Sequence, residues 1–371
     1  MNQFFKLQAT SGKARAGLIQ TEHGPIETPV FMPVGTRGSV KTVPQENLEQ
    51  MDFQIILGNT YHLYLRPGHE LVERQGGLHQ FISWPRPILT DSGGFQIFSL
   101  SDLCSKDEEG VTFRSHLDGS LHEIGPERAM EIQRALGADI VMSFDECPSL
   151  PASKEDLAAS MELTLRWAQR SKNVPLKPHQ HLFGIIQGGL HQDLRQQCMA
   201  KLMEIGFDGL ALGGLSVGEK NEEMVQFLDD FVVQMPEMMP RYLMGVGTPL
   251  DVLNGVRLGL DMFDCVLPTR NARNGQFLTT HGPLSIKKER FKEDQLPPDT
   301  DCDCPVCRRY RRSYIRHLYL VGEYLAGQLI THHNLYFYRK MMRRARSAIL
   351  TNQFDDFYRN FYKDYCSNHW I

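Results

Sequence analysis

The stretch Met262–Gly275, MFDCVLPTRNARNG, combines residue types that could act on a phosphate-bearing substrate. An apolar run delivers one carboxylate, Asp264, and two arginines follow it, Arg270 and Arg273. Pro268 predicts the end of a strand, and the asparagines and the glycine after it predict a loop. An acid followed by arginines suits catalysis beside a phosphate group. Taken alone, however, this stretch is more commonly a structural carboxylate at a strand end followed by a solvated loop.

Length and composition are those of an ordinary globular protein. The chain has 371 residues, 41% of them hydrophobic and 23% charged, which is enough to bury a large core without disulfides. The first residues, MNQFFKLQATSGKARAG, lack the apolar core of a signal peptide, and no apolar run is long enough to cross a bilayer. We expect a cytoplasmic protein without a membrane span.

The eight cysteines are unevenly spaced. Cys302, Cys304 and Cys307 lie within six residues, and His317, His332 and His333 follow downstream. Three thiolates and one imidazole predict a closed tetrahedral Zn²⁺ site of structural type. Three free thiols, the alternative, would be hard to keep inert so close together.

Charge is also unevenly distributed. Residues 270–346 contain 16 Lys and Arg against 7 Asp and Glu, a net charge of +9, whereas the rest of the chain carries −13. Arginines and tyrosines interleave between Arg308 and Arg316, a combination that suits phosphates and stackable bases. This segment predicts a polyanion-binding face rather than a merely solvated surface. For the basic helix expected at Asn334–Leu350, RNA contact and a solvated face remain equally open.

Eight short apolar runs, several ending in glycine or a polar residue, predict β-strands: Thr28–Val34, Phe53–Leu57, Pro87–Thr90, Ala138–Phe144, His181–Ile186, Gly209–Leu212, Arg241–Val246 and Asp261–Leu267. Four intervening segments carry helical periodicity or capping signals: Pro126–Leu136, Lys154–Ser171 after Ser153, Gln192–Ile205 and Asn221–Met235. Eight strand–helix units favour a (β/α)₈ barrel. An open doubly wound sheet is the alternative, but no GxGxxG follows the first strand. In a barrel, Asp91, Asp145 and Asp264 would converge on one mouth.

Specific motifs then resemble those of the bacterial tRNA-guanine transglycosylases, also called queuine tRNA-ribosyltransferases. They span nearly the whole chain: TPVFMPVGT (28–36), GNTYHL (58–63), TDSGGFQ (90–96), FDEC (144–147), QGG (187–189), GGLSVGE (213–219), MGVG (244–247), DCVLPTRNARNG (264–275) and CxCx₂C. In that family the zinc histidine follows the last cysteine after 25 residues, which selects His333 over His332.

The resemblance implies a (β/α)₈ TIM barrel with a C-terminal zinc-binding subdomain. We expect residues 1–270 to form the main part of the barrel and residues 271–350 a zinc-binding, basic, RNA-contacting insertion. Residues 351–371 would form a C-terminal helical segment packing on the barrel. The resemblance further implies one structural Zn²⁺ per subunit, held by Cys302, Cys304, Cys307 and His333, and a homodimer.

The implied reaction replaces the wobble guanine of GUN-anticodon tRNAs (Asp, Asn, His, Tyr) with 7-aminomethyl-7-deazaguanine, preQ1, on the route to queuosine. Exchange at an N-glycosidic carbon without loss of the ribose calls for double displacement through a covalent glycosyl-enzyme. By resemblance Asp264 is the nucleophile and Asp91 the general acid/base. The base-binding residues would be Phe95, Asp145, Gln187, Gly214, Leu215 and Met244. Arg270 and Arg273 would contact the anticodon loop, whereas Thr248 stands where the family often has an RNA-binding lysine.

Four alternatives remain to be weighed. A queuine-using enzyme of eukaryotic type would need room that Cys147 and Val217 occupy. An archaeal-type enzyme would carry an additional C-terminal RNA-binding region. A non-catalytic partner subunit would not need both Asp91 and Asp264. In an unrelated metallohydrolase with catalytic zinc, a saturated Cys₃His set would leave no open coordination position.

Overall fold

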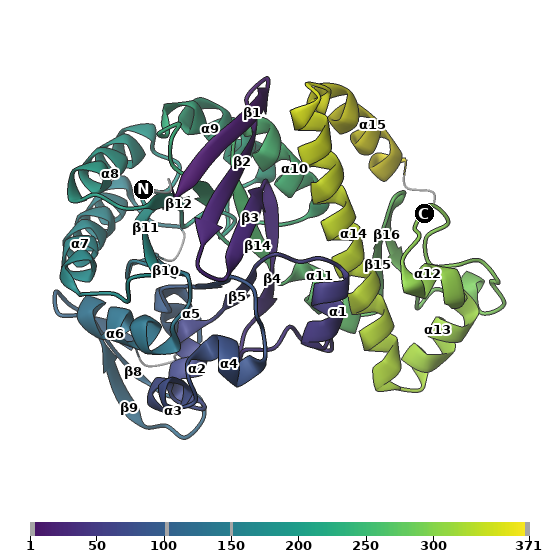
Figure 1. The fold of residues 1–371 in the computed structure, drawn as a ribbon, viewed down its shortest axis with the longest axis horizontal. Helices are drawn as coiled ribbons and strands as arrows, with labels where there is room; N and C mark the ends of the chain where they lie inside the picture. The colour runs from purple at the N-terminus through teal and green to yellow at the C-terminus, as the bar shows by residue number, and fades with distance from the viewer. Residues whose placement is uncertain (1–3, 101–103, 149–150, 368–371) are drawn as a thin grey trace.

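The computed structural model describes residues 4–100, 104–148 and 151–367. Eight parallel strands close into a barrel in chain order, and β14 pairs with β4 to complete the ring (Figure 1). They are β4 (Val30–Gly35), β5 (Ile56–Gly58), β6 (Ile88–Thr90), β10 (Ile140–Met142), β11 (His181–Ile186), β12 (Gly209–Leu212), β13 (Arg241–Leu243) and β14 (Met262–Cys265). All eight overlap the predicted runs. The (β/α)₈ prediction is confirmed, and the open doubly wound sheet is excluded.

Side chains alternate across the barrel wall, as the period of a strand requires. Met32 of β4 and Met262 of β14 point into the barrel interior, where Leu89, Met142 and Phe183 join them. The intervening Phe31 and Phe263 point outward, into the larger core between the strands and the surrounding helices. The barrel is therefore filled by side chains, and any cavity must lie at one of its ends.

The helices on the barrel agree with the predicted periodicity. α6 (Pro126–Leu136) and α8 (Gln192–Ile205) have the predicted bounds, and α7 runs over Lys154–Asn173. Ser153 caps α7 as predicted, since its hydroxyl accepts a 3.1 Å hydrogen bond from the backbone N–H of Asp156. The remaining helices of this part are α1 (Gln45–Gln50), α2 (Thr60–Leu65), α3 (His69–Arg74), α4 (Leu78–Ile82), α5 (Gly94–Leu100), α9 (Asn221–Phe231) with a 3₁₀ turn at Val232–Gln234, and α10 (Pro249–Leu258).

Three small antiparallel sheets were not predicted. β1 (Phe5–Ser11), β2 (Ala14–Thr21) and β3 (Gly24–Thr28) contribute Phe5, Ile19 and Ile26 to the interior cluster of the barrel. The sheet of β1–β3 therefore closes the amino-terminal end of the barrel. The other two sheets are β7 (Cys104–Lys106), β8 (Val111–Arg114) and β9 (Leu121–Ile124), and β15 (Gln276–Thr279) with β16 (Gly282–Ser285).

Two predicted segments differ clearly from the structure. The last barrel strand ends at Cys265, and the segment read as a loop is the helix α11 (Leu267–Arg273). Pro268 lies in the first turn of this helix, where its missing N–H is tolerated, so it starts a helix here as well as ending a strand. The long helix α14 spans Tyr324–Leu350 and begins ten residues before the predicted Asn334. α12 (Pro305–Arg309), α13 (Arg312–Leu320), a 3₁₀ turn at Glu289–Phe291 and α15 (Phe354–Cys366) complete the described elements.

The basic residues of α14 mostly serve the fold. The guanidinium of Arg346 is buried and donates to the carbonyls of Gly17 and Thr28, and Arg339 pairs with Asp52 at 2.5 Å. Lys340 pairs with Asp303 at 2.8 Å. All three side chains contact the rest of the fold, and the guanidinium of Arg346 is too buried for either RNA contact or a solvated face. They tie α14, which crosses beside the barrel in Figure 1, to neighbouring segments. Among the described residues, no helix is both long and apolar enough to cross a membrane.

Candidate active site and metal centre

A cavity of about 340 Å³ opens at the carboxyl ends of the barrel strands. Its wall contains every residue predicted to be catalytic or base-binding: Asp91, Phe95, Asp145, Gln187, Gly214, Leu215, Met244 and Asp264. Asp91 directly follows β6, and Asp264 lies one residue before the end of β14. Asp145 follows β10, and Gln187 follows β11. The barrel closure therefore brings together residues that are up to 173 positions apart in the chain.

Asp91 is buried against polar donors from the neighbouring strand end. The backbone N–H of Thr60 donates to Oδ1 at 2.8 Å, and the amide of Asn59 donates to Oδ2. Burial raises the pKa of Asp91 to about 6, the hydrogen bonds from Thr60 and Asn59 oppose that rise, and the negative charge of Asp264 adds to it. A carboxyl group with a pKa close to neutrality can both give and take a proton.

Asp264 is held through one of its two oxygens. The hydroxyl of Tyr242 donates to Oδ1 at 2.6 Å, and the backbone N–H of Gly245 donates to the same oxygen at 2.7 Å. Burial raises the pKa of Asp264, and these two hydrogen bonds oppose the rise because they stabilise the carboxylate. Neither bond uses Oδ2. The arrangement fixes the side chain while leaving its second oxygen for chemistry in the cavity.

Asp145 and Gln187 form a polar edge on the part of the wall that follows β10 and β11, beside the strand end that carries Asp91. The amide of Gln187 donates to Oδ2 of Asp145 at 2.8 Å, and the hydroxyl of Ser92 donates to Oδ1 at 2.8 Å. Gly214 has a φ of +64°, and a Cβ there would lie 2.5 Å from Oε1 of Gln187. Only glycine therefore fits beside this amide without displacing it.

Apolar side chains complete the cavity. Phe95 and Met244 line it, and Phe95 is 50% exposed, which leaves one face of its ring available for stacking. Cys147 and Val217 occupy the wall next to Gly214 and Leu215. Burial raises the pKa of the Cys147 thiol to about 12, so the thiol stays protonated at neutral pH.

Sequence reasoning missed three supporting residues, Asn59, Ser92 and Tyr242. The first two lie inside motifs that were singled out, GNTYHL and TDSGGFQ, so their polar types after a strand were a usable signal. Tyr242 carried no such signal, because it sits within an apolar run that reads simply as a strand. Its hydroxyl becomes functional only because the barrel places β13 beside β14.

Arg270 and Arg273 do not line the cavity. Both are exposed on α11, which follows directly from the strand that carries Asp264. Lys41 is close enough to Arg273 and Arg37 for their charges to reinforce the lowering of the Lys41 pKa that burial causes. Burial, with Arg37 among the nearby charges, also lowers the pKa of the cavity residue His62 to about 4. Arg37 and Lys41 were not predicted.

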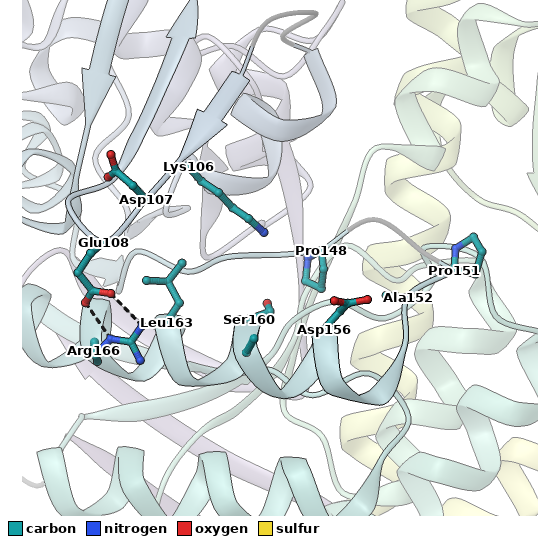
Figure 2. A pocket seen from close by; sticks show the side chains of 11 residues that line it. Lys106, Asp107, Glu108, Pro148, Pro151, Ala152, Asp156, Ser160, Leu163 and Arg166 are labelled. Carbon is teal, nitrogen blue, oxygen red and sulfur yellow. Dashed lines mark hydrogen bonds and ion pairs between the residues drawn. The ribbon is translucent and has the colours of Figure 1, made fainter.

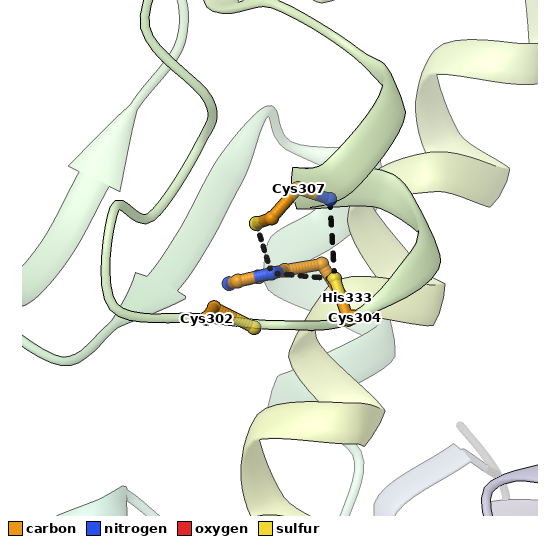
Figure 3. Close-up of side chains that lie close together, drawn as sticks. All are labelled: Cys302, Cys304, Cys307 and His333. Atoms are coloured by element: carbon orange, nitrogen blue, oxygen red, sulfur yellow. Dashed lines mark hydrogen bonds between the residues drawn. The ribbon is translucent and has the colours of Figure 1, made fainter.

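Cys302, Cys304, Cys307 and His333 come together as predicted (Figure 3). Nδ1 of His333 lies 3.3 Å from Sγ of Cys307 and 3.5 Å from Sγ of Cys304. The opposite nitrogen, Nε2, lies 3.0 Å from the carbonyl of Leu278 and can donate to it, which leaves the Nδ1 lone pair for a metal ion. Three sulfurs and one nitrogen around a largely buried point fit a metal ion. His332 is not part of this group.

A second group of possible ligands, His23, His79 and Asp139, lies at the amino-terminal end of the barrel. The two imidazole rings are stacked, with centroids 3.6 Å apart and planes inclined by 12°. Their in-plane lone pairs therefore lie in almost parallel planes and do not point at one ion. Each ring instead contacts one oxygen of Asp139, at 2.8 Å from His23 and 3.1 Å from His79. This group is a structural latch that joins the turn between β2 and β3 and the helix α4 to the start of β10.

A shallow groove of about 500 Å³ lies between β7 and α7 (Figure 2). Three of its charged residues form ion pairs: Glu108 pairs with Arg166 at 2.8 Å, and Lys106 pairs with Glu146 at 2.6 Å. Glu146 directly follows Asp145 in the chain, so the ion pair with Lys106 lies next to the polar edge of the main cavity. None of the predicted site residues lines this groove.

The fold and the site define a (β/α)₈-barrel protein with an acid-lined cavity at its mouth and a Cys₃His group near its C-terminus. A family model described as Queuine tRNA-ribosyltransferase matches residues 10–367. Proteins named Queuine tRNA-ribosyltransferase are similar to this chain over nearly its whole length. The one from Halothermothrix orenii is 54% identical over 353 residues, covering 95% of each chain. The one from Fusobacterium nucleatum is 54% identical over 364 residues, covering 97% of this chain and 98% of its own.

The chain belongs to the queuine tRNA-ribosyltransferase family. It is therefore an enzyme, a transferase of tRNA modification. This membership excludes an unrelated metallohydrolase with catalytic zinc.

Proposed function

We propose that this enzyme exchanges the wobble guanine of GUN-anticodon tRNAs (Asp, Asn, His, Tyr) for preQ1 by double displacement. The observation that carries the proposal is the pair Asp91 and Asp264 in one cavity. Their environments differ: Asp91 has a pKa of about 6, and Asp264 is anchored through Oδ1 alone. Two carboxylates with different environments are what acid/base and nucleophilic roles require.

In the first step Oδ2 of Asp264 attacks C1′ of the target nucleotide. The C1′–N9 bond breaks as the C1′–O bond forms, and Asp91 gives a proton to the departing guanine. In the second step the incoming preQ1 nitrogen attacks C1′, its proton passes to Asp91, and the carboxylate of Asp264 leaves. The ribose stays in the tRNA throughout, and Asp91 returns to its starting protonation state.

The cavity would recognise the base by its edge and its faces. Asp145 and Gln187 present a carboxylate and an amide to one edge, with backbone groups of Gly214 and Leu215 beside them. Phe95 and Met244 would hold the ring between them. Cys147 and Val217 limit the space on this wall, which favours the small aminomethyl group of preQ1 over the cyclopentenediol of queuine.

The RNA would approach along exposed cations outside the cavity. Arg270 and Arg273 on α11 belong to one cluster with Arg37 and Lys41. Among the described residues, none of these four side chains forms an ion pair with a carboxylate, so their charges are available to phosphates. We extend the contact to the basic zinc-binding segment, residues 271–350.

The metal ion is proposed to be one structural Zn²⁺ per subunit. Three thiolates and a histidine whose second nitrogen is held by a carbonyl are the donor set that zinc favours. Because these four residues saturate a tetrahedral ion, it would hold the segment folded and take no part in exchange. Elemental analysis of purified protein that gave no zinc, or clearly less than one ion per chain, would contradict this assignment.

A homodimer is proposed from exposed apolar residues at the corner between α13 and α14. Tyr324 is 89% exposed, and Leu320, Val321 and Tyr314 are exposed beside it in sequence. Exposed apolar side chains are one feature of protein–protein contact surfaces, so this segment is the candidate contact. Sedimentation equilibrium would test the state directly, and a monomer at working concentrations would contradict it.

The function is tested by base exchange. Radiolabelled guanine, preQ1 and queuine would each be offered with unmodified tRNA carrying a GUN anticodon. We expect guanine and preQ1 to enter the tRNA and queuine to enter poorly. Equal use of queuine would contradict the preQ1 assignment, whereas no exchange of any base would contradict the transglycosylase reaction.

A further inference from the structure

Arg195 lies behind the cavity wall and does not line the cavity. It belongs to α8 and its side chain is fully buried. Nε donates to the carbonyl of Gly189 at 2.9 Å, and Nη1 donates to the carbonyl of Ile186 at 2.6 Å. One guanidinium therefore forms hydrogen bonds to the backbone on both sides of Gln187.

The segment Ile186–Gly189 leaves β11 in an irregular conformation, so its carbonyls need hydrogen-bond partners from outside the sheet. Gly188 and Gly189 have φ values of +136° and +59°, a region that other residues rarely adopt. A backbone of this shape cannot continue the ladder of the sheet. The planar, forked donors of an arginine satisfy two of its carbonyls at once and fix their separation.

The position of this backbone decides where the amide of Gln187 points. That amide donates to Asp145 at 2.8 Å and lies beside Gly213 and Gly214. A Cβ at Gly213 would lie 2.7 Å from Nε2 of Gln187, so the next loop leaves room for the amide only because it has glycine there. A shift of the segment Ile186–Gly189 would either lengthen and weaken the bond to Asp145 or push the amide into that loop.

Arg195 is retained in an environment that is unfavourable to a charge. Burial lowers its pKa to about 10, so it stays charged at neutral pH. Within the described part of the chain it forms no ion pair, and its Nη2 has no hydrogen-bond partner. The ring of Phe227, 5.5 Å from the guanidinium, gives it a further contact. An apolar side chain would fill such a place at lower free energy if packing were the only demand.

We propose that Arg195 is a positioning residue for base recognition, which sets the amide of Gln187 by holding the carbonyls of Ile186 and Gly189. The inference rests on the proposed role of Gln187 in binding the base. Guanine and preQ1 share the edge that this amide would face, so Arg195 would govern affinity for both. It would not govern affinity for tRNA phosphates, which contact residues elsewhere.

The test is a double-mutant cycle on the affinity for free guanine, measured by equilibrium dialysis. Arg195→Met should weaken guanine binding about 10-fold or more, approaching the loss in Gln187→Ala, while tRNA affinity changes less than about twofold. The double variant should bind guanine no more weakly than Gln187→Ala alone, because Arg195 acts through Gln187. Arg195→Lys, which keeps the charge and some of the donors, should recover part of the affinity.

Arg241→Met is the matched control. Arg241 is also a buried arginine that donates to backbone carbonyls, those of Met235, Pro236 and Gly259, but none of these three residues is next to a cavity residue in the chain. This variant should lose thermal stability and retain guanine affinity. If Arg195→Met fails to fold, Arg195→Lys carries the same cycle.

The outcomes separate two failures. Guanine affinity retained in both Arg195 variants, or losses that simply add in the double variant, would overturn the positioning role. Unchanged affinity in Gln187→Ala would instead overturn the proposed base-binding role of Gln187, on which the inference rests.

Discussion

The two ends of the barrel treat buried carboxylates in opposite ways. At the amino-terminal end Asp139 accepts hydrogen bonds from both imidazoles of the latch and from the backbone N–H groups of His23 and Ile88. Burial alone would raise its pKa, but these hydrogen bonds outweigh burial and hold the pKa of Asp139 well below its usual range. At the carboxyl-terminal end Asp91 and Asp264 have fewer donors, and their pKa values are raised.

The difference separates a structural acid from acids that can react. Asp139 uses both oxygens in hydrogen bonds within the fold, so neither oxygen remains for a substrate. Both hydrogen bonds to Asp264 use Oδ1 and leave Oδ2 available, and the pKa of Asp91 lies near neutral pH, at about 6. Burial is similar at both ends, so the number and type of donors decide which acid is reactive. Substituting each acid by a near-isosteric amide should therefore give opposite results at the two ends.

Asp264→Asn should have the largest effect. The amide fits the same space but is a poor nucleophile, so exchange should fall by a factor on the order of 10⁴ while the fold persists. With wild-type enzyme, tRNA and a base analogue that cannot complete exchange, a covalent protein–RNA adduct should survive a denaturing gel and map to Asp264. An adduct on Asp91, or full exchange by the variant, would reverse the assigned roles.

Asp91→Asn should slow exchange by about 10²–10⁴-fold through lost proton transfer and leave tRNA binding intact. The wild-type pH profile sharpens this prediction, because the pKa of Asp91 is about 6. Release of guanine needs the protonated acid, so its single-turnover rate should fall as pH rises through about 6. Attack by the incoming base needs the ionised form, so that rate should rise over the same range. Identical profiles for the two steps would argue against one residue serving both.

Asp145→Ala should weaken binding of guanine and preQ1 without removing chemistry. Losing one hydrogen bond to a charged group costs about 1.5–3 kcal/mol, or roughly one to two decades of affinity. Calorimetric titration with the free bases would measure the loss. Ser92→Ala, which removes one donor to Asp145 without touching the carboxylate itself, should have a smaller effect. Unchanged affinities in Asp145→Ala would remove this residue from base recognition.

Asp139→Asn should leave turnover per folded molecule unchanged and lower stability by about 2 kcal/mol at pH 7. The sign with pH follows from its depressed pKa in the folded protein. The ionised latch contributes its full stability above the unfolded pKa of about 4 and loses it as pH falls toward the lower folded pKa. Denaturant titrations should therefore show the gap between wild type and variant shrinking below about pH 4. A gap independent of pH would contradict the charged latch.

Val217→Gly should have the smallest effect and should change selectivity rather than rate. Removing the side chain opens space on the wall that Cys147 also lines. We expect queuine use relative to preQ1 to improve by roughly 10-fold, the scale expected for small changes in an apolar pocket. Competition between the two bases in the exchange assay would measure it. No gain in queuine use would place the steric limit elsewhere, and Cys147→Ala would then be the next variant to measure.

The sequence by itself was sufficient for the barrel and for the residues at its mouth. A closed parallel sheet buries both faces of every strand, so its strands are apolar throughout. For this reason each of the eight apolar runs could be recognised as a strand in the sequence. Acids and glycines directly after those runs must meet at one end, whatever the loops do. The metal group was equally predictable, since three cysteines within six residues leave few other chemical uses.

Tertiary structure alone decided which polar groups support the site. Tyr242 reads as one more apolar strand residue, and Arg195 as one more charge on an amphipathic helix, until packing buries them against Asp264 and the Gln187 loop. The same limit explains α11, whose proline fits a strand end or a first helical turn until the neighbouring helix α14 packs against it. Hydrogen bonds between residues distant in the chain leave no periodic trace in sequence, because only the closed barrel makes those residues neighbours.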